Sequence, residues 1–251
     1  MKRQQVLIAP FFFDSTSFYI KEKLLEEGIP FVLKDKQVYL PFIGYLLSNE
    51  NERKISPVHL ISFLTQKVIL VAIYEKWENV TASKAAIRLG VTKMSANRCF
   101  DEIEYLNVDI LGMKGKSRVI TVPADIQKLW NDVRVILRNP VIARYELKED
   151  IQLGKKAGIT ALCEYSLLSD NEYPTYAITK KEITESGIRK MKQVHSGEEI
   201  GCVVLELGYF IDFKNKKLED PLSVTLSLTE SEKQDERIGI SIKRMLEEYV
   251  W

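Results

Sequence analysis

The chain has 251 residues, of which 45% are hydrophobic and 28% are charged, and its formal net charge is +1. This composition is ordinary for a globular protein and provides hydrophobic core for one large domain or for two to three small ones. It excludes a polycation, so any binding to nucleic acid must come from a local basic surface rather than from the overall charge.

No apolar stretch in the sequence approaches the roughly 20 residues that a membrane-spanning helix needs. The most apolar opening stretch, residues 6–13, contains Pro10 and is not followed by a small-residue cleavage site, which argues against a signal peptide. We therefore expect a cytoplasmic protein with no membrane contact.

The cysteine and histidine content argues against disulfides and metal sites. Cys99, Cys163 and Cys202 lie far apart and cannot all be paired, which indicates a reducing compartment. His59 and His195 do not stand at metal-site spacing with each other or with any cysteine, and we interpret both as solvated or capped. We expect no cofactor, and we expect the cysteines to be buried as small apolar residues.

Residues 1–55 form the first predicted domain, a small α/β unit. The apolar spacing predicts a helix that ends before Gly28, and residues 31–33 and 38–40 flank a polar turn as in a short hairpin. The polar run at residues 48–54 is typical of a linker to the next domain.

The second predicted domain spans residues 56–122 and begins with a helix. Ser56 followed by Pro57 is a helix-start signal, because serine caps a helix and proline fits its first position. Apolar residues then recur at helical spacing over residues 60–74. We therefore expect the first helix of this domain to start at Ser56.

Two further helices are joined by a tight turn. Thr81 is the predicted cap of a short helix over residues 82–89, and Gly90 opens a turn that ends at Thr92. A third helix is predicted over residues 93–106. Two helices joined by a short glycine turn are typical of a helix-turn-helix element.

The periodicity after the third helix changes to that of strands. Residues 108–111 and 118–122 are two runs rich in β-branched residues, and the Lys114-Gly115-Lys116 turn lies between them. Three helices followed by a β-hairpin are the elements of a winged helix, in which the hairpin is the wing. We therefore predict an α+β fold with a winged helix-turn-helix domain between the small N-terminal unit and a C-terminal α/β domain.

Residues 123–251 form the predicted C-terminal α/β domain, with a regulatory or interaction role. Its expected elements are a helix after Pro123, an extended segment at 141–147, a helix near 160–168, strands at 175–179 and 201–210, and a terminal helix at 235–251. Residues 220–228 carry both a helix-start signal and strand-like alternation, so either structure is open there.

The polar residues of the second domain are the candidate DNA contacts. The third helix would enter a major groove about 12 Å wide, and its side chains could reach base edges or phosphates. The preceding helix would approach the phosphate backbone, and the hairpin turn would approach the adjacent backbone or minor groove. The candidate residues are Thr81, Lys84, Arg88, Thr92, Lys93, Ser95, Asn97, Arg98, Lys114, Lys116, Ser117 and Arg118.

Residues 81–98 resemble the winged helix of MarR-type transcriptional regulators. The likeness rests on a helix, a Leu-Gly-Val-Thr turn at residues 89–92, and a following helix that begins Lys-Met-Ser. The resemblance implies a DNA-binding regulator. Typical members are shorter and dimerise through flanking helices, so the long C-terminal part departs from the family and puts sensing of small ligands in the MarR manner in doubt.

Residues 158–165, 220–224 and 235–237 are similar to segments of abortive-infection antitoxin regulators, which join an N-terminal winged helix to a C-terminal α/β domain. That resemblance implies a repressor that reads a promoter repeat and regulates a neighbouring toxin gene. A protein partner bound by the C-terminal domain belongs to the alternative of a protein-interaction module.

Several prominent residues have plainer interpretations. We interpret Met94 and Phe100 as core residues and Trp130 as a packing residue under the wing. The charged runs at residues 180–182 and 214–217 are typical of solvated faces.

The sequence contains no glycine-rich phosphate loop, nucleophile elbow or His-Glu metal helix. The nearest approach to an enzyme signature is Asp132 with Glu146 and Lys148, which resembles the acid-plus-lysine pattern of metal-dependent nucleases. Asn139-Pro140 interrupts the hairpin that this pattern requires. We therefore expect that the chain is not an enzyme.

The sequence thus predicts a regulator of transcription, most simply a repressor, that binds specific double-stranded DNA as a homodimer, because one winged helix covers only a half-site. The alternative is a protein-interaction or replication-initiation module in which the winged helix is a scaffold, or the antitoxin of a toxin–antitoxin pair.

Overall fold

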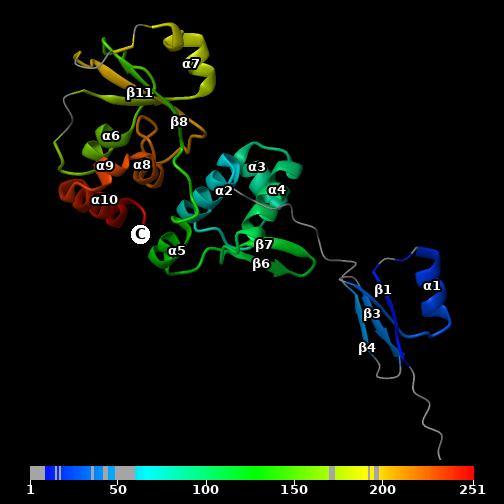
Figure 1. The fold of residues 1–251 in the computed structure, drawn as a ribbon. Coiled ribbons are helices and arrows are strands. Elements are labelled where there is room, and N and C mark those ends of the chain that lie inside the picture. Colours follow the sequence, from blue (N-terminus) through cyan, green and yellow to red (C-terminus); the bar gives the residue numbers. More distant parts are fainter. Residues whose placement is uncertain are drawn as a thin grey trace, which may run out of the picture. The chain divides into compact units, whose positions relative to one another are not determined.

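The computed structural model describes residues 9–14, 16, 18–34, 37–41, 45–48, 60–169, 173–191, 193–194 and 198–251. The fold is of the mixed α+β class, as predicted, with three small sheets among the described residues. Contacts divide the chain into two compact units, residues 1–55 and 56–251, each of which is described by itself (Figure 1).

The first unit consists of one helix and a four-stranded sheet. Its elements are β1 (Phe11–Phe13), α1 (Phe18–Glu26), β2 (Phe31–Leu33), β3 (Gln37–Leu40) and β4 (Tyr45–Ser48). The sheet order is β1-β2-β3-β4, with β1 parallel to β2 and the other pairs antiparallel. The predicted helix and the β2–β3 hairpin are confirmed. The predicted linker begins at the last residue of β4, and residues 49–54 lie outside the described residues.

The second unit begins with three helices and a small sheet. These elements are α2 (Phe63–Tyr74), β5 (Val80–Thr81), α3 (Ala82–Leu89), α4 (Lys93–Tyr105), β6 (Leu111–Lys114) and β7 (Ser117–Ile120). Strand β7 is the centre of an antiparallel sheet of order β5-β7-β6. The predicted bounds of α3 are confirmed, and those of α4 agree to within one residue.

The predicted start of α2 at Ser56 is wrong. The helix begins at Phe63, and Ser62 is its cap: the Ser62 hydroxyl accepts a hydrogen bond from the Thr65 backbone N–H at 3.2 Å. The Ser62 backbone N–H in turn donates to Glu102 of α4 at 3.0 Å. A partner 40 residues away in the sequence therefore stabilises the later start. Ser56, Pro57 and His59 lie outside the described residues, as does His195.

The rest of the second unit builds a second sheet covered by helices. Its elements are α5 (Ile126–Val133), β8 (Val141–Leu147), β9 (Lys155–Lys156), α6 (Gly158–Tyr165), β10 (Thr175–Ile178), α7 (Lys180–Ser186), the 3-10 turn η2 (Ile188–Lys190), β11 (Cys202–Leu207), α8 (Pro221–Ser227), α9 (Glu230–Lys233) and α10 (Glu236–Tyr249). The sheet order is β8-β11-β10-β9, and β10 and β11 are parallel while both edge pairs are antiparallel.

Residues 220–228, for which the sequence left two structures open, form helix α8. Asp220 caps it by accepting a hydrogen bond from the Ser223 backbone N–H at 3.0 Å, and Pro221 occupies the first turn. Six of its seven residues are buried, so the helix has no polar face from which a helical period could be recognised.

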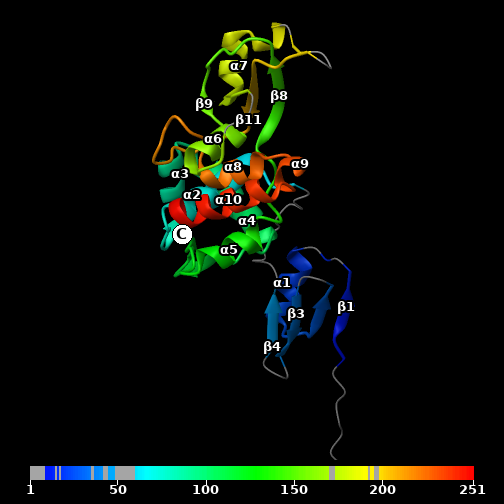
Figure 2. The ribbon, with the colours of Figure 1, turned by 90° about the vertical axis from the view of Figure 1, so that its left-hand side faces the viewer.

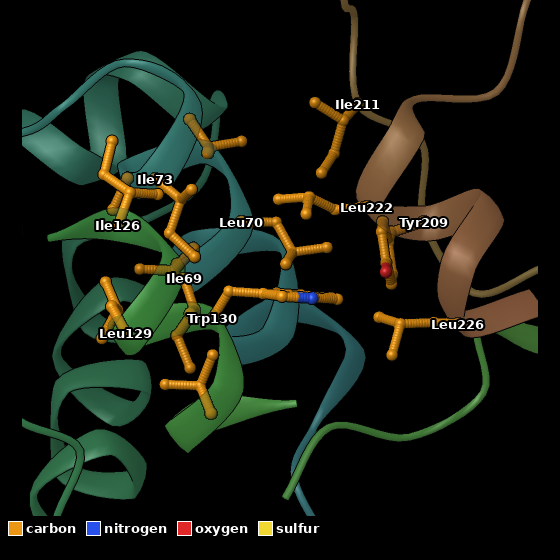
Figure 3. Close-up of a cluster of buried hydrophobic side chains, with 14 of the residues drawn as sticks. Ile69, Leu70, Ile73, Ile126, Leu129, Trp130, Tyr209, Ile211, Leu222 and Leu226 are labelled. Carbon is orange, nitrogen blue, oxygen red and sulfur yellow. The ribbon is translucent and has the colours of Figure 1, made fainter. Parts of the chain in front are cut away.

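A single buried cluster joins the elements on both sides of residue 122, where the sequence predicted a domain boundary. Figure 3 shows Leu70 of α2, Trp130 of α5 and Leu226 of α8 in this cluster. Trp130 is 3% exposed, which confirms that it is a packing residue, while its place under the wing stays a prediction. In Figure 2, α6, α8 and α10 lie against the layer of α2 and α4, and the four-stranded sheet with α7 lies beyond them.

Within the described part of the chain, no helix combines the length and the apolar character that crossing a bilayer requires.

Candidate nucleic-acid interface

The α3–α4 turn is fixed by local capping. The Thr81 hydroxyl accepts a hydrogen bond from the Lys84 backbone N–H, and the Thr92 hydroxyl accepts one from the Ser95 backbone N–H at 3.1 Å. Gly90 ends α3 with φ of 65°, a left-handed conformation that favours glycine. The predicted turn and both predicted caps are therefore confirmed.

Helix α4 has one buried and one exposed face. Ala96, Cys99, Phe100 and Ile103 are buried, and this spacing follows one side of a helix. The prediction that Phe100 is core is confirmed, but the same prediction for Met94 is wrong, because its side chain is 66% exposed. Met94 lies two residues before Ala96, which places it about 200° around the helix from the buried face.

The leading end of α4 carries the predicted polar residues on its accessible side. Thr92, Lys93 and Arg98 are exposed, and Ser95 and Asn97 are half-buried. The hydroxyls of Thr92 and Ser95 lie 2.9 Å apart and are hydrogen-bonded to each other. These two hydroxyls therefore serve the helix cap, while the longer polar side chains extend beyond it.

Five of the predicted cations have no acidic partner within the part of the chain that the structure describes. They are Lys84 on α3, Lys93 and Arg98 on α4, and Lys114 and Lys116 at the β6–β7 turn, and all five are exposed. An Arg98 guanidinium nitrogen lies 3.8 Å from Met94 Sδ, a weak contact that leaves the charge unpaired.

The β6–β7 hairpin ends in a two-residue turn, Gly115-Lys116. Lys114 pairs with Ser117 across the turn, and Gly115 has φ of 62°. Glycine with positive φ at the first central position is typical of the tight turns that join twisted antiparallel strands. The turn is exposed, and Figure 1 shows the hairpin extending to the side opposite α5.

Two of the predicted contact residues are instead held by carboxylates. Arg118 forms ion pairs with Asp101 at 2.8 Å and Glu104 at 2.7 Å, its side chain is 15% exposed, and its guanidinium carbon lies 5.8 Å from the centre of the Phe100 ring. Arg88 donates from Nε to Glu75 at 2.6 Å. Arg118 therefore fixes the hairpin against α4, and Arg88 ties α3 to the end of α2.

The acidic residues of α4 are engaged in contacts of their own. Asp101 and Glu104 pair with Arg118, and Glu102 accepts from Ser62. The leading end of the helix carries no acidic residue in its first turn. The cations there are therefore not opposed by the acids of the same helix.

The nuclease-like trio has different partners in the structure. Glu146 pairs with Arg144 at 3.1 Å on β8, and Lys148 pairs with Glu198. Among the described residues, no three Cys, His, Asp or Glu side chains gather in a way that could hold a metal ion.

Within the described residues, the structure shows no disulfide at the three cysteines. Cys99 and Cys202 are buried, as expected, whereas Cys163 is half-buried and departs from that expectation.

The structure contains a buried pair of carboxyl groups, Glu219 and Asp220, that the sequence did not predict. Glu219 accepts hydrogen bonds from the Gly158 backbone N–H at 3.0 Å and the Ser227 hydroxyl at 3.3 Å, and Asp220 accepts one from the Tyr74 hydroxyl at 2.6 Å. Burial raises the pKa of Glu219 to about 8 and also raises the pKa of Asp220. The pair lies where α2, α6 and α8 meet, and no local sequence pattern marks it.

Comparisons of this chain with family models, with curated proteins and with solved structures found no significant match. The resemblances to MarR-type regulators and to abortive-infection antitoxin regulators therefore stay predictions.

Proposed function

We propose that this chain is a sequence-specific regulator of transcription that binds double-stranded DNA through a winged helix. The order α2, β5, α3, α4, β6, β7, with both β5 and β6 paired to β7, supports the proposal. The observation that carries it is the set of five exposed cations at α3, at the leading end of α4 and at the hairpin turn. Folding does not require them, because none has an acidic partner among the described residues.

In this proposal α4 enters the major groove and β6–β7 is the wing. Arg98 and Lys93 bind guanine edges or phosphates, and Asn97 faces adenine. Lys84 and the two lysines of the hairpin turn neutralise phosphates and set the register of the protein on the duplex. Two copies bind a repeated site, because a single winged helix covers a half-site. The C-terminal part of the second unit then serves dimerisation or a protein partner.

A binding site selected from a random duplex library with the wild-type protein provides the ligand for the test. We expect Arg98→Ala to weaken binding to the selected site by roughly 1–3 kcal/mol and to leave random DNA nearly unaffected. Lys116→Ala should weaken binding to the selected site and to random DNA equally. It should also lower, by about 1, the slope of the logarithm of the binding constant against the logarithm of the salt concentration (the salt slope). Titrations at several salt concentrations measure both effects.

Lys181→Ala is the matched control, because Lys181 is an exposed lysine of α7 outside the interface. If Arg98→Ala bound the selected site as tightly as the wild type, the assignment of α4 as the recognition helix would be wrong.

A protein-interaction module is the second candidate, and Ile87 favours it. This residue of α3 is 84% exposed, an unusual environment for isoleucine on a helix. A salt titration with random duplex DNA separates the two functions. The affinity of a DNA-binding protein falls steeply between about 50 and 200 mM salt, whereas an interaction module does not bind the DNA at any of these concentrations.

A further inference from the structure

A cavity of about 470 Å³ lies between α5, α8 and α10, apart from the candidate DNA interface. This volume is in the range of small-molecule sites. Trp130, Leu226 and Leu246 are among the buried residues that line it, and the half-buried Trp251 and Ile242 complete its apolar lining. Two tryptophans in one cavity provide broad, flat surfaces against which an apolar ring or chain can pack.

The charged residues that line this cavity are all basic. They are Arg134 directly after α5, Lys233 from α9 and Lys243 from α10, and no acidic residue is among the described residues that line it. Lys233 pairs with Glu230 at 3.0 Å, and Lys243 lies 3.9 Å from Glu247. Arg134 has no ion pair within the described part of the chain. The rim therefore has uncompensated positive charge beside an apolar floor.

Gly239 is a lining residue with no side chain of its own. It lies within α10 and lines the cavity, and a Cβ added there would meet no atom within 4 Å. Its φ is not positive, so the backbone does not require glycine. Glycine within a helix is destabilising relative to alanine. A side chain at this position would therefore extend into open space.

We infer that this cavity binds a small organic anion, whose aromatic ring or acyl chain packs against the two tryptophans and whose carboxylate or phosphate lies at Arg134 and Lys243. The cavity volume limits the size of the ligand. The apolar lining favours an apolar group, and the basic residues at the rim favour a negative charge. The inference does not rest on the proposed DNA binding, because none of the lining residues belongs to α3, α4 or the β6–β7 hairpin.

The test uses isothermal titration calorimetry of the full chain with 2-naphthoate and octanoate, and with the uncharged 2-naphthalenemethanol as comparison. We expect at least one of the two anions to bind saturably with a dissociation constant below about 1 mM. Its affinity should be about tenfold higher than that of the alcohol. The variant Arg134→Gln with Lys243→Gln should lose this preference and bind the acid and the alcohol about equally. Arg244→Gln, also on α10 but outside the lining, should behave as the wild type.

Gly239→Leu provides the second arm, because it fills the cavity with a side chain that meets no neighbour at its Cβ and that favours a helix. We expect it to fold with an unchanged or raised melting temperature and to lose about tenfold or more in anion affinity. Absence of saturable anion binding to the wild type, or equal binding by a folded Gly239→Leu variant, would overturn the inference.

Discussion

Arg118 has the residue type of a phosphate contact and the environment of a structural ion pair. It stands beside the hairpin turn, yet its guanidinium is directed to Asp101 and Glu104 of α4 rather than to solvent. Salt bridges between exposed groups contribute little to stability, but this arginine is 15% exposed and packs near the Phe100 ring. Its contribution should therefore appear in stability rather than in affinity for DNA.

We expect Arg118→Met to lower the free energy of unfolding by about 1 kcal/mol, because its ion pairs with Asp101 and Glu104 are lost while methionine retains part of the packing. Urea denaturation measures this change. The salt slope of binding to random DNA should stay at the wild-type value, in contrast to Lys116→Ala. A slope lowered by about 1 would show that Arg118 contacts a phosphate after all.

For single residues, the sequence predicts whether a side chain is exposed to solvent better than it predicts which residue that side chain pairs with. The exposed positions of Lys93 and Arg98 follow from their place opposite a periodic buried face. The partners of Arg118 lie 14 and 17 positions away on another element, so their pairing depends on how the hairpin folds back onto α4. Met94 is apolar yet exposed, because its angle around the helix, and not its apolar character, decides which face it lies on.

The caps decide where the elements of the candidate interface begin. Thr92 holds the first turn of α4 by accepting from the Ser95 backbone N–H. We expect Thr92→Ala to lower the free energy of unfolding by about 1 kcal/mol, the usual cost of losing such a cap. Urea denaturation checks this value.

Thr92→Asp separates the cap from the surface charge. Aspartate caps helices well and its charge is favourable at a helix N-terminus, so the stability of this variant should be close to that of the wild type. The same negative charge at the leading end of α4 should repel phosphates and weaken DNA binding at low salt. Unchanged DNA affinity in this variant would place the duplex elsewhere on the molecule.

At the scale of elements, local signals predicted α3 and α4 closely, because each joins a cap to a clear apolar period. The helix expected after Pro123 is present as α5, but it begins only after its cap Asp125 and ends at Val133. Helix α7 was missed because its first residues resemble a solvated charge run; they are indeed exposed, and the helix depends on the capping box of Thr179 and Glu182. Strand β9 has two residues and no period to detect.

The whole second unit should respond to pH through its buried carboxyl pair. Glu219 has a pKa of about 8 in the folded chain, compared with an ordinary value near 4.5, and the cause is burial. The folded state therefore holds this proton more tightly than the unfolded state does. Its contribution to stability is complete below about pH 4.5 and is lost as the pH rises toward 8.

We expect Glu219→Gln to reduce the slope of unfolding free energy against pH between about pH 5 and 8, by up to about 1.4 kcal/mol per pH unit. Part of the slope should persist, because burial also raises the pKa of Asp220. Urea denaturation across this range measures the slope, and Glu248→Gln at an exposed position of α10 is the control. If the unfolding free energies of Glu219→Gln and the wild type changed with pH in parallel, burial would not raise the pKa of Glu219 as argued.

The order of predicted helices and strands indicated the α+β class, but not how the parts of the chain share a core. Helix α2 is buried over eight of its twelve residues, which a one-sided amphipathic helix would not be. Gln66 donates to the Tyr209 hydroxyl at 2.9 Å, across 143 positions of sequence. Such contacts depend on the finished topology, and no local window of sequence contains them.

The buried cluster shared by elements before and after residue 122 limits where the chain can be truncated. A fragment ending at residue 122, where the winged-helix segment was expected to stop, would retain Leu70 and Ile73 of α2 but lose the α5 and α8 side chains from the same buried cluster. Apolar surface formerly enclosed would then face water, which costs about 25 cal/mol for each Å². We therefore expect the excised fragment to be prone to self-association, and the second unit as a whole to be the safer piece for studying α4 in isolation.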